Sequence, residues 1–598
     1  MQANDRTLGI VFDTSIRFMI PLFQRPYVWK REDNWEPLWE AVEAVADRRV
    51  AEQEPRPHFL GAIVLDSLDV PTGEVVAKHV IDGQQRLATL QIMLAAIRDL
   101  CKARGVVNYH GAFCRLTENY VASKKVPESV YKVWPTSQDR THFVNVMTSG
   151  SPEALLQAYA THKAKRILHQ VPQAYLFFYE VANEWIGKAI GDALDARLQS
   201  LHDAIRHDLL LVIVDLGDKD DAQLIFETMN ALMTPLLPGD LIKNLLFHRA
   251  ERQGLDVQTI YNRYWMTFDD GDALWREEVR QGRLKRPMLD LFIQHYLTLK
   301  KQAIVEIPRL YGDFKEYLNS REDASVEDEI KTLRDYADVY KGFRECLADS
   351  REHWFFRRLN QLDTQMPLPI LLEVFKGPKS QDDRLQVIEL IESYLVRRAV
   401  MGLTYKAYNR VFVDLVKKLS ETSFSADEVR AFLLTREGDS SRWPDDAEFV
   451  EALTKLPLGS MFKGKRARLR IVLEAFERSL YDPRTERVEV PTGLTIEHIM
   501  PQSWLEHWPL PDGGGEDKDD LRNHMVQTIG NLTLLTQELN STESNGPWTK
   551  KKPALIKYSK LLMNSRVQSE DTWDEKAIMK RGMLIAEMAR QTWQKPQA

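Results

Sequence analysis

The feature that most restricts how this chain can fold is an apolar segment followed by a single glycine and then directly by a long helix. KHVID (78–82) predicts a strand, and RLATLQIMLAAIRDL (86–100) predicts a helix because its leucines recur at three- and four-residue steps. Gly83 permits a tight turn, and a helix start offers free N–H groups to an anion. Arg86 could add a bidentate contact, and Asp82 could hold Mg²⁺. The layout predicts a phosphate-binding turn, although a capped helix with a structural aspartate would show the same pattern.

The chain of 598 residues is too long for one hydrophobic core, so we expect several domains. Residues 1–250 mix helices with strands, predicted at 58–66 and 208–218, and indicate an α+β domain. From 251 to 440 the apolar spacing is helical almost throughout, which predicts an α-helical middle region. Residues 441–598 form the third expected domain.

Several classes of protein are excluded by composition. No run of about 18 apolar residues exists, so we expect no membrane span. Without a visible secretory signal, and with three cysteines only, the chain is expected to be cytoplasmic and reduced. The net charge of −7 confines any nucleic-acid surface to local patches.

The most chemically distinctive segment is LTIEHIMPQSW (494–504), in which Glu497 and His498 are adjacent. Neighbouring side chains of a strand face opposite ways, so both reach one site only where the strand ends and the backbone turns, as Pro501 favours. Asn531 and Asn540 follow downstream. Carboxylate and amide oxygens suit Mg²⁺, and a neutral histidine can accept a proton from water that attacks phosphorus. A surface histidine with asparagines capping turns is the alternative for each residue taken alone.

The ordered set resembles the His-Asn-His nuclease superfamily with its ββα-metal finger, in the branch whose signature is E-H-x-x-P followed by G-N-L and N-x-x-(S/N). The resemblance implies that His498 is the general base and that Glu497 and Asn540 are the metal ligands. It also implies that Asn531 holds the loop that orients His498.

The N-terminal motifs resemble the ParB/sulfiredoxin-like nucleotidase family named for its D-G-Q-Q-R loop, across most of residues 10–250. The matching segments are IPLFQRPYVWKRED (20–33), the loop at 82–86, FETMN (226–230) and DLIKN (240–244). The resemblance implies a cleft for a nucleoside triphosphate lined by Asp82, Gly83, Gln84, Gln85, Arg86, Gln24, Arg25, Glu227, Asn230 and Lys243. VWPTSQDRTHF (133–143) would add Asp139 and Arg140, for which a packed turn is an equal alternative.

Two basic segments, FKGKRARLR (462–470) and WTKKKPALIKYSK (548–560), suit a phosphate backbone, although a solvated helix face is the usual fate of such a run. The aromatic residues around 27–39 could stack on a base, with core packing as the commoner alternative. The candidate DNA contacts are Tyr27, Trp29, Lys465, Arg466, Lys551 and Lys552.

Taken together, the two ends resemble the GmrSD-type modification-dependent restriction endonucleases and the Ssp-type effectors that sense phosphorothioate DNA. The resemblance implies an antiphage protein in which nucleotide binding and modification sensing gate a metal-dependent DNA endonuclease or nickase. It implies Mg²⁺ or another divalent ion, hydrolysis of GTP or ATP, double-stranded DNA as partner, and an oligomer as one possible state. The mark would be a modified cytosine or a phosphorothioate. A non-catalytic DNA-binding regulatory protein is the alternative.

Overall fold

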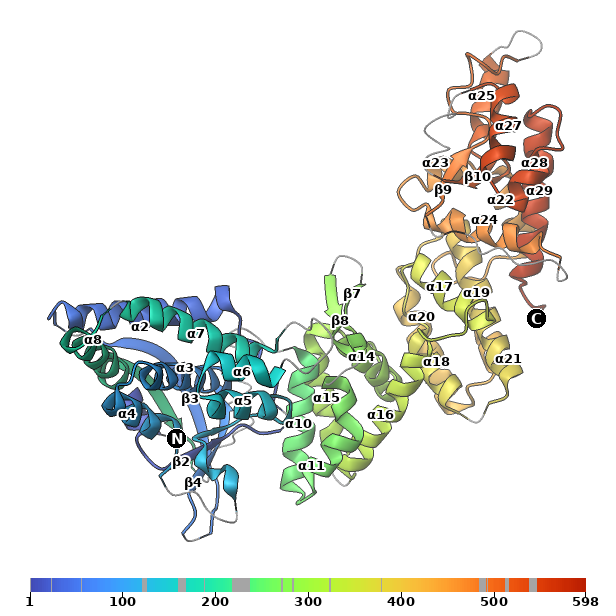
Figure 1. Cartoon of the computed structure of the whole chain (residues 1–598). Helices are drawn as coiled ribbons and strands as arrows, with labels where there is room; N and C mark the ends of the chain where they lie inside the picture. Colours follow the sequence, from blue (N-terminus) through green and yellow to red (C-terminus); the bar gives the residue numbers. More distant parts are fainter. Residues whose placement is uncertain are drawn as a thin grey trace. The chain divides into compact units, whose positions relative to one another are not determined.

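The structure is a computed structural model that describes residues 2–597 except 23, 55, 72, 121–125, 160–167, 188, 218–236, 270–272, 282–283, 322–323, 378, 483–490, 492, 511–515 and 537–545. The chain divides into two compact units, Met1–Ala273 with Glu322–Ile330, and Leu274–Arg321 with Lys331–Ala598. Figure 1 shows the first in blue to green and the second in green to red. No described helix is long and apolar enough to cross a bilayer.

The first unit is built on a six-stranded sheet with the order β1-β6-β3-β4-β2-β5. The strands β2, β4 and β5 are mutually parallel, β3 runs antiparallel to β4, and β6 is parallel to β3. The loops that follow β2, β4 and β5 therefore leave the sheet at one edge. The strands are β1 (Gln2–Thr7), β2 (Ile16–Met19), β3 (His58–Ser67), β4 (Val76–Asp82), β5 (Val133–Trp134) and β6 (Leu209–Asp215).

Helices cover this sheet and bury one continuous apolar core between helices and strands. The helices of the unit are α1 (Leu8–Phe12), α2 (Glu36–Val50), α3 (Gln84–Ala103), α4 (Val107–Thr117), α5 (Ser137–Ser149), α6 (Pro152–Tyr159), α7 (Gln170–Ile186), α8 (Asp192–Asp203), α10 (Pro238–Arg252), α11 (Val257–Ile260) and α12 (Met266–Asp269). The predicted strands at 58–66, 78–82 and 208–218 and the helix at 86–100 are confirmed as β3, β4, β6 and α3. The apolar spacing of residues 221–232 predicts a further helix, which lies outside the described residues.

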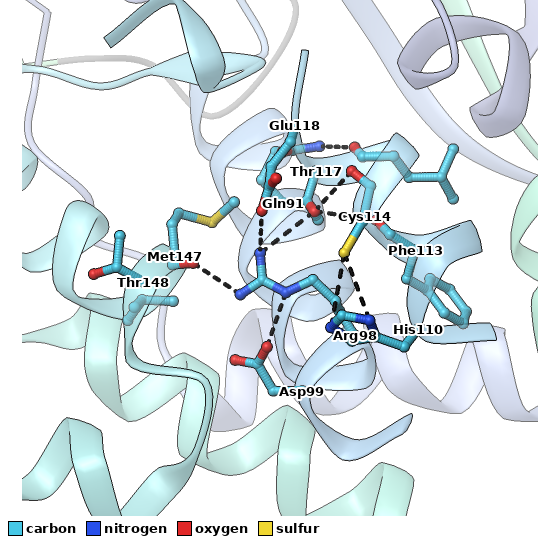
Figure 2. Close-up of polar contacts among 12 residues, drawn as sticks. Gln91, Arg98, Asp99, His110, Phe113, Cys114, Thr117, Glu118, Met147 and Thr148 are labelled. Atoms are coloured by element: carbon cyan, nitrogen blue, oxygen red, sulfur yellow. Dashed lines mark hydrogen bonds and ion pairs between the residues drawn. The ribbon is translucent and has the colours of Figure 1, made fainter. Parts of the chain in front are cut away.

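A buried ion pair fixes α3 against its neighbours (Figure 2). Arg98 Nε donates to Asp99 Oδ1 at 2.8 Å, and its Nη2 donates to the backbone oxygen of Met147 on α5 at 2.8 Å. The Tyr175 hydroxyl on α7 donates to Asp99 Oδ2 at 2.8 Å, and the Arg98 guanidinium also lies 3.3 Å from Glu118. Since both charges are buried and hydrogen-bonded, they lock α3 to α5 and α7 and so fix the position of the loop at its start.

The second unit is mainly helical, with two small antiparallel strand pairs, β7 (Glu278–Gln281) with β8 (Leu284–Pro287) and β9 (Thr495–His498) with β10 (Leu532–Leu535). The pair β7–β8 departs from the expected α-helical character of the middle region. Its residues are mostly charged or polar, so no apolar alternation signals the strands. The glycines and acids of residues 511–520 predict a loop, but a helix begins at Glu516.

One apolar core of the second unit holds β9 and β10 and takes in side chains of residues 396–400, 449–476 and 561–593. The helices of the unit follow in chain order. They are α13 (Ala273–Arg276), whose first residue belongs to the first unit, α14 (Met288–Lys301), α15 (Leu310–Asn319), α16 (Val326–Gly342), which spans both units, α17 (Arg351–Gln361), α18 (Leu368–Lys376), α19 (Gln381–Val400), α20 (Tyr408–Glu421), α21 (Ala426–Leu434), α22 (Asp446–Lys455), α23 (Leu458–Met461), α24 (Ala467–Ser479), α25 (Glu516–Val526), α27 (Trp548–Tyr558), α28 (Leu562–Val567) and α29 (Glu575–Thr592).

Candidate functional sites

Three loops meet at one edge of the first unit's sheet, because β2, β4 and β5 are parallel and end there. They carry Gln24 and Arg25, the turn from Asp82 to Arg86, and the start of α5 with Asp139. The loop after β2 is fixed from both sides. Gln85 Oε1 accepts from the backbone N–H of Val28 at 2.9 Å, and Asp139 Oδ2 accepts from that of Tyr27 at 2.9 Å. The predicted loop residues therefore do come together.

The turn after β4 has the geometry that its glycine suggests. Gly83 has φ of +93°, and a side chain there would place its Cβ 2.9 Å from Ile63 Cγ1. The turn leaves Asp82 at the end of β4 and Gln84 as the first residue of α3. Burial raises the pKa of Asp82, whereas the Gly83 N–H and the charges of Arg86 and Arg25 act against that rise. The free N–H groups of the helix start and these two arginines suit an anionic ligand.

Arg86 lies against β3, where its Nη1 donates to the backbone oxygen of Ala62 at 2.6 Å. A Cβ at Gly61, where φ is +111°, would lie 2.7 Å from the Arg86 guanidinium carbon, so any other residue would both strain the backbone and displace that group. We did not identify Gly61 from the sequence, although an isolated glycine inside a strand pattern signals a close approach of this kind.

Gln24 and Arg25 lie near the same turn. The Gln24 amide nitrogen donates to the backbone oxygens of Val80 and Ile81 at 2.7 and 3.1 Å. Burial lowers the pKa of Arg25, and the carboxylates of Asp240 and Asp82 oppose that effect. Arg25 therefore lies within electrostatic reach of both β4 and α10, and Asp240 joins the candidate site.

Lys243 is expected to line the nucleotide cleft. It is 2% exposed, its ammonium group forms an ion pair with Asp269, and it lies 5.2 Å from the centre of the Tyr261 ring. The Tyr261 hydroxyl donates to the same carboxylate at 2.9 Å. The lysine is held in a buried pair, so in this conformation its charge is neutralised by Asp269. Glu227 and Asn230 lie outside the described residues.

The second site is centred on His498, the last residue of β9, which lies opposite Leu532 of β10. The imidazole is 8% exposed, and burial lowers its pKa to about 4. Its Nε2 lies 3.4 Å from Gln527 Oε1, and Gln502 Nε2 lies 3.3 Å from its Nδ1 and 3.4 Å from its Nε2. Because an amide oxygen only accepts hydrogen bonds, the contact with Gln527 favours the tautomer with the proton on Nε2 and the lone pair on Nδ1.

Asn531 and Lys551 fix the backbone beside this imidazole. Asn531 is fully buried and binds both backbone groups of Met500, in the loop that follows His498. Lys551, on α27, donates to the backbone oxygens of His498 and Ile499 at 2.8 and 3.0 Å. Asn531 thus holds the loop as the resemblance implies. Lys551 was expected to contact DNA, but its ammonium group is buried against backbone carbonyls and supports the strand instead.

Glu497 faces away from His498 in the strand, where it lies opposite Thr533 of β10 and is half-buried. The second expected metal ligand, Asn540, lies outside the described residues. Within the parts of the chain that are described, no group of three or more His, Cys, Asp or Glu side chains is placed to hold a metal ion.

Gly459, Gln502 and Gln527 are residues of this site that we did not identify from the sequence. A Cβ on Gly459 would lie 3.3 Å from His498 Nε2 and 2.7 Å from Gln527 Oε1. The glycine therefore permits the contact between α23 and the imidazole. Gln502 follows His498 by four residues, but glutamines are too common for that spacing to be a signal.

The other expected DNA contacts differ in exposure. Lys465 is exposed, and Arg466 donates to the backbone oxygen of Ile496 on β9 at 2.7 Å. Lys552 donates to the backbone oxygen of Glu570 at 3.1 Å. Tyr27 is 4% exposed and its hydroxyl bonds Thr89 and Trp35. A stacking role for Tyr27 is therefore wrong in this conformation, because its ring belongs to the core.

Trp29 is half-buried and packs against the same core. The aromatic residues of this segment are thus largely core side chains, which is the alternative that the sequence left open.

Comparisons with known families bear on both sites. The model of the GmrSD restriction endonuclease N-terminal domain matches residues 8–247, and the model of the C-terminal domain of GmrSD restriction endonucleases matches residues 443–588. The first match contains the Asp82 turn, and the second contains His498 with Asn531 and Lys551. No curated protein matches the chain. The two matched domains imply a DNA endonuclease of restriction type, and the chain belongs to the GmrSD-type restriction endonucleases.

Proposed function

We propose that this endonuclease breaks the phosphodiester bond at His498, in the unit formed by β9, β10 and α27. One observation carries the proposal: a buried imidazole at the end of β9 has its backbone fixed by Lys551 and its following loop fixed by Asn531. Its Nδ1 would take the proton from the attacking water. The low pKa of His498 keeps the ring neutral at physiological pH, as this role requires.

We further propose that Glu497, with Asn540, holds a divalent cation such as Mg²⁺. A carboxylate and an amide offer oxygen ligands, which fit a hard cation. Such an ion supplies neutralisation of the charge that builds on the phosphate and the leaving oxygen. The antiparallel pair β9–β10, with α25 inserted between its strands and α27 after it in the chain, supports the likeness to the ββα-metal nucleases.

At the sheet edge of the first unit we propose a site that binds and hydrolyses GTP or ATP. The start of α3, Arg86 and Arg25 would receive the phosphates, and Asp82 would position Mg²⁺ or water. In keeping with the family resemblance, nucleotide turnover and a mark on the DNA, a modified cytosine or a phosphorothioate, would gate cleavage of phage DNA. The two sites belong to different compact units, so such gating would be allosteric coupling.

A plasmid-nicking assay tests the nuclease proposal. With Mg²⁺ present, the wild type should nick supercoiled plasmid, His498→Ala should lose at least 100-fold in rate, and chelation by EDTA should stop the reaction. His507→Ala is the matched control, because His507 is an exposed histidine of the same domain. Equal nicking by the wild type and His498→Ala would move the activity elsewhere, and no nicking by any protein would favour a DNA-binding regulator.

Nucleotide hydrolysis tests the first site. Asp82→Asn should reduce turnover at least tenfold while leaving nicking in the absence of nucleotide in place, and Asp69→Asn, at an exposed position, should match the wild type. Unchanged turnover in Asp82→Asn would remove the assignment. Turnover measured with unmodified, methylated, glucosylated and phosphorothioate duplexes would identify the sensed mark.

A further inference from the structure

A cavity of about 320 Å³ lies inside the second unit, at one end of the packed helices α17, α19 and α24. Figure 1 labels these three helices. Three segments line it: the end of α17 with its turn, the end of α19 with the loop to α20, and the basic segment that enters α24. We call it the Tyr405 cavity; its lining includes Gln361, Asp363, Leu395, Tyr405, Lys465 and Arg468. Its volume is at the lower end of the range for small-molecule sites, about 300–1,000 Å³.

Aromatic and cationic side chains are combined on this lining. Tyr405 is 58% exposed, so the cavity is open to solvent beside its ring. Lys465 Nζ lies 5.4 Å from the centre of that ring. Tyr408 is buried on the same lining, and burial lowers the pKa of Arg468 while the two tyrosines oppose that effect. A flat apolar group could stack on Tyr405 with a negative group beside Lys465 and Arg468.

Neither cation has a carboxylate partner among the described residues; Arg468 instead donates to the backbone oxygen of Ala399 at 3.3 Å. Gln361 donates through its Nε2 to Glu474, and its buried Oε1 accepts no hydrogen bond from a described residue. Asp363, held at φ of +51° by the turn after α17, adds a carboxylate to the lining. The cavity therefore offers positive charge for an anion and, separately, acceptor oxygens that match exocyclic amino groups of a base.

The same basic segment is tied to the proposed nuclease centre. It begins beside Gly459, which approaches His498 Nε2, and Arg466 donates to the backbone oxygen of Ile496 on β9. Lys465 follows Gly459 by six positions, a span of at most about 22 Å even when fully extended. A DNA strand advances about 3.4 Å per nucleotide. The cavity thus lies within reach of a strand that passes His498.

We propose that the Tyr405 cavity receives one nucleotide flipped out of the DNA. Its base would stack on Tyr405, with its amino group on the acceptor oxygens and its phosphate on Lys465 and Arg468. The inference rests on the proposed nuclease function and assigns base reading to the second unit rather than to the nucleotide site. A base extruded from a duplex exposes its whole edge, so a cavity of this size can inspect a modification there.

Binding to short duplexes in EDTA, which prevents cleavage, tests the inference with the full chain. Flipping costs less at a mismatch, so the wild type should bind a duplex with one central mismatch about tenfold more tightly than its matched counterpart. Tyr405→Ala and Lys465→Ala should reduce this preference to about twofold or less. Tyr120→Ala is the control, because Tyr120 is 96% exposed and lines none of the described cavities.

Each outcome separates the cavity from the nuclease. Equal binding of both duplexes by the wild type would overturn the inference, as would a mismatch preference that survives in Tyr405→Ala and Lys465→Ala. Calorimetry with free deoxycytidine monophosphate tests whether the cavity instead binds a free nucleotide, which offers the same base and phosphate. Tyr405-dependent binding of that compound without any mismatch preference would also overturn extrusion from DNA. Failure to bind either duplex would overturn the proposed DNA function, and this inference with it.

Discussion

The side chain of Asn531 binds both backbone groups of Met500: its Oδ1 accepts from the N–H at 2.8 Å, and its Nδ2 donates to the carbonyl at 2.8 Å. The same amide donates to Val526 O and accepts from Trp573 Nε1, both at 3.0 Å. Asn531→Ala removes all four hydrogen bonds and leaves buried groups without partners. We expect it to destabilise the second unit by about 3 kcal/mol or more and to abolish nicking. Urea unfolding and plasmid nicking measure the two effects.

Asn564 provides a control of matched burial. It is also fully buried, and its Nδ2 donates to Leu534 O at 3.0 Å and to Ser559 Oγ at 2.8 Å. Asn564→Ala should cost similar stability and yet retain most nicking per folded molecule, because the loop after His498 keeps its own support. If both variants lose nicking to the same extent, the effect of Asn531 is one of stability alone.

Gly459 limits what can lie beside the imidazole of His498. In Gly459→Ala the new methyl group would lie 2.7 Å from Gln527 Oε1 and 3.3 Å from His498 Nε2, so both side chains must move. We expect nicking to fall at least tenfold, since small displacements of a general base are costly. Gly464→Ala, five residues on, meets nothing within 4 Å and should nick like the wild type. Equal nicking rates for the two variants would show that nicking does not depend on how closely Gly459 packs against His498 Nε2.

The regular elements of the first unit could be predicted because their signals are local. The strand before Gly83 and the helix after it follow from apolar runs within thirty residues, and both form where expected. The position of Asn531 could be inferred only through the resemblance, as its partners lie up to 42 residues away.

For three of the assigned residues, packing against distant neighbours decides whether the functional group is exposed. Tyr27 bonds Thr89, 62 residues away, and Lys551 bonds the backbone of His498, 53 residues away. Lys243 is paired with Asp269. A sequence pattern places a basic or aromatic residue near a site, but burial among distant neighbours determines whether its functional group faces the ligand.

Alanine substitutions at Gly83 and Gly73 allow the effect of backbone strain to be separated from the effect of steric contact. Gly83→Ala would combine an unfavourable φ of +93° with a Cβ 2.9 Å from Ile63 Cγ1 and 3.2 Å from Ala62 O. Gly73 has nearly the same φ, +92°, but nothing within 4 Å of a new Cβ. Both variants should lose about 1–2 kcal/mol of stability from the backbone, whereas only Gly83→Ala should lose nucleotide turnover, by at least tenfold. Equal turnover in the two would show that the Asp82 turn is not part of the nucleotide site.

His295, on α14, makes the second unit sensitive to acid. It is buried, its Nδ1 lies 3.4 Å from the Tyr340 hydroxyl, and burial lowers its pKa from 6.5 to about 3. Between these two pKa values the imidazole of His295 therefore stays neutral in the folded state, whereas it takes up a proton in the unfolded state. This contribution to stability is fully present above pH 6.5 and is lost as the pH falls from 6.5 towards 3.

Between pH 7.5 and pH 4.5 this single group should lower the free energy of unfolding by about 2–3 kcal/mol. His295→Gln removes the titration, so the variant should be less stable than the wild type at pH 7.5 but should lose less stability on acidification. Urea unfolding of both proteins at the two pH values, followed by tryptophan fluorescence, isolates the effect as a difference, because their other titrating groups are the same. Parallel losses in the two proteins would mean that the acid sensitivity arises at other groups, and that the imidazole of His295 is protonated without disrupting α14.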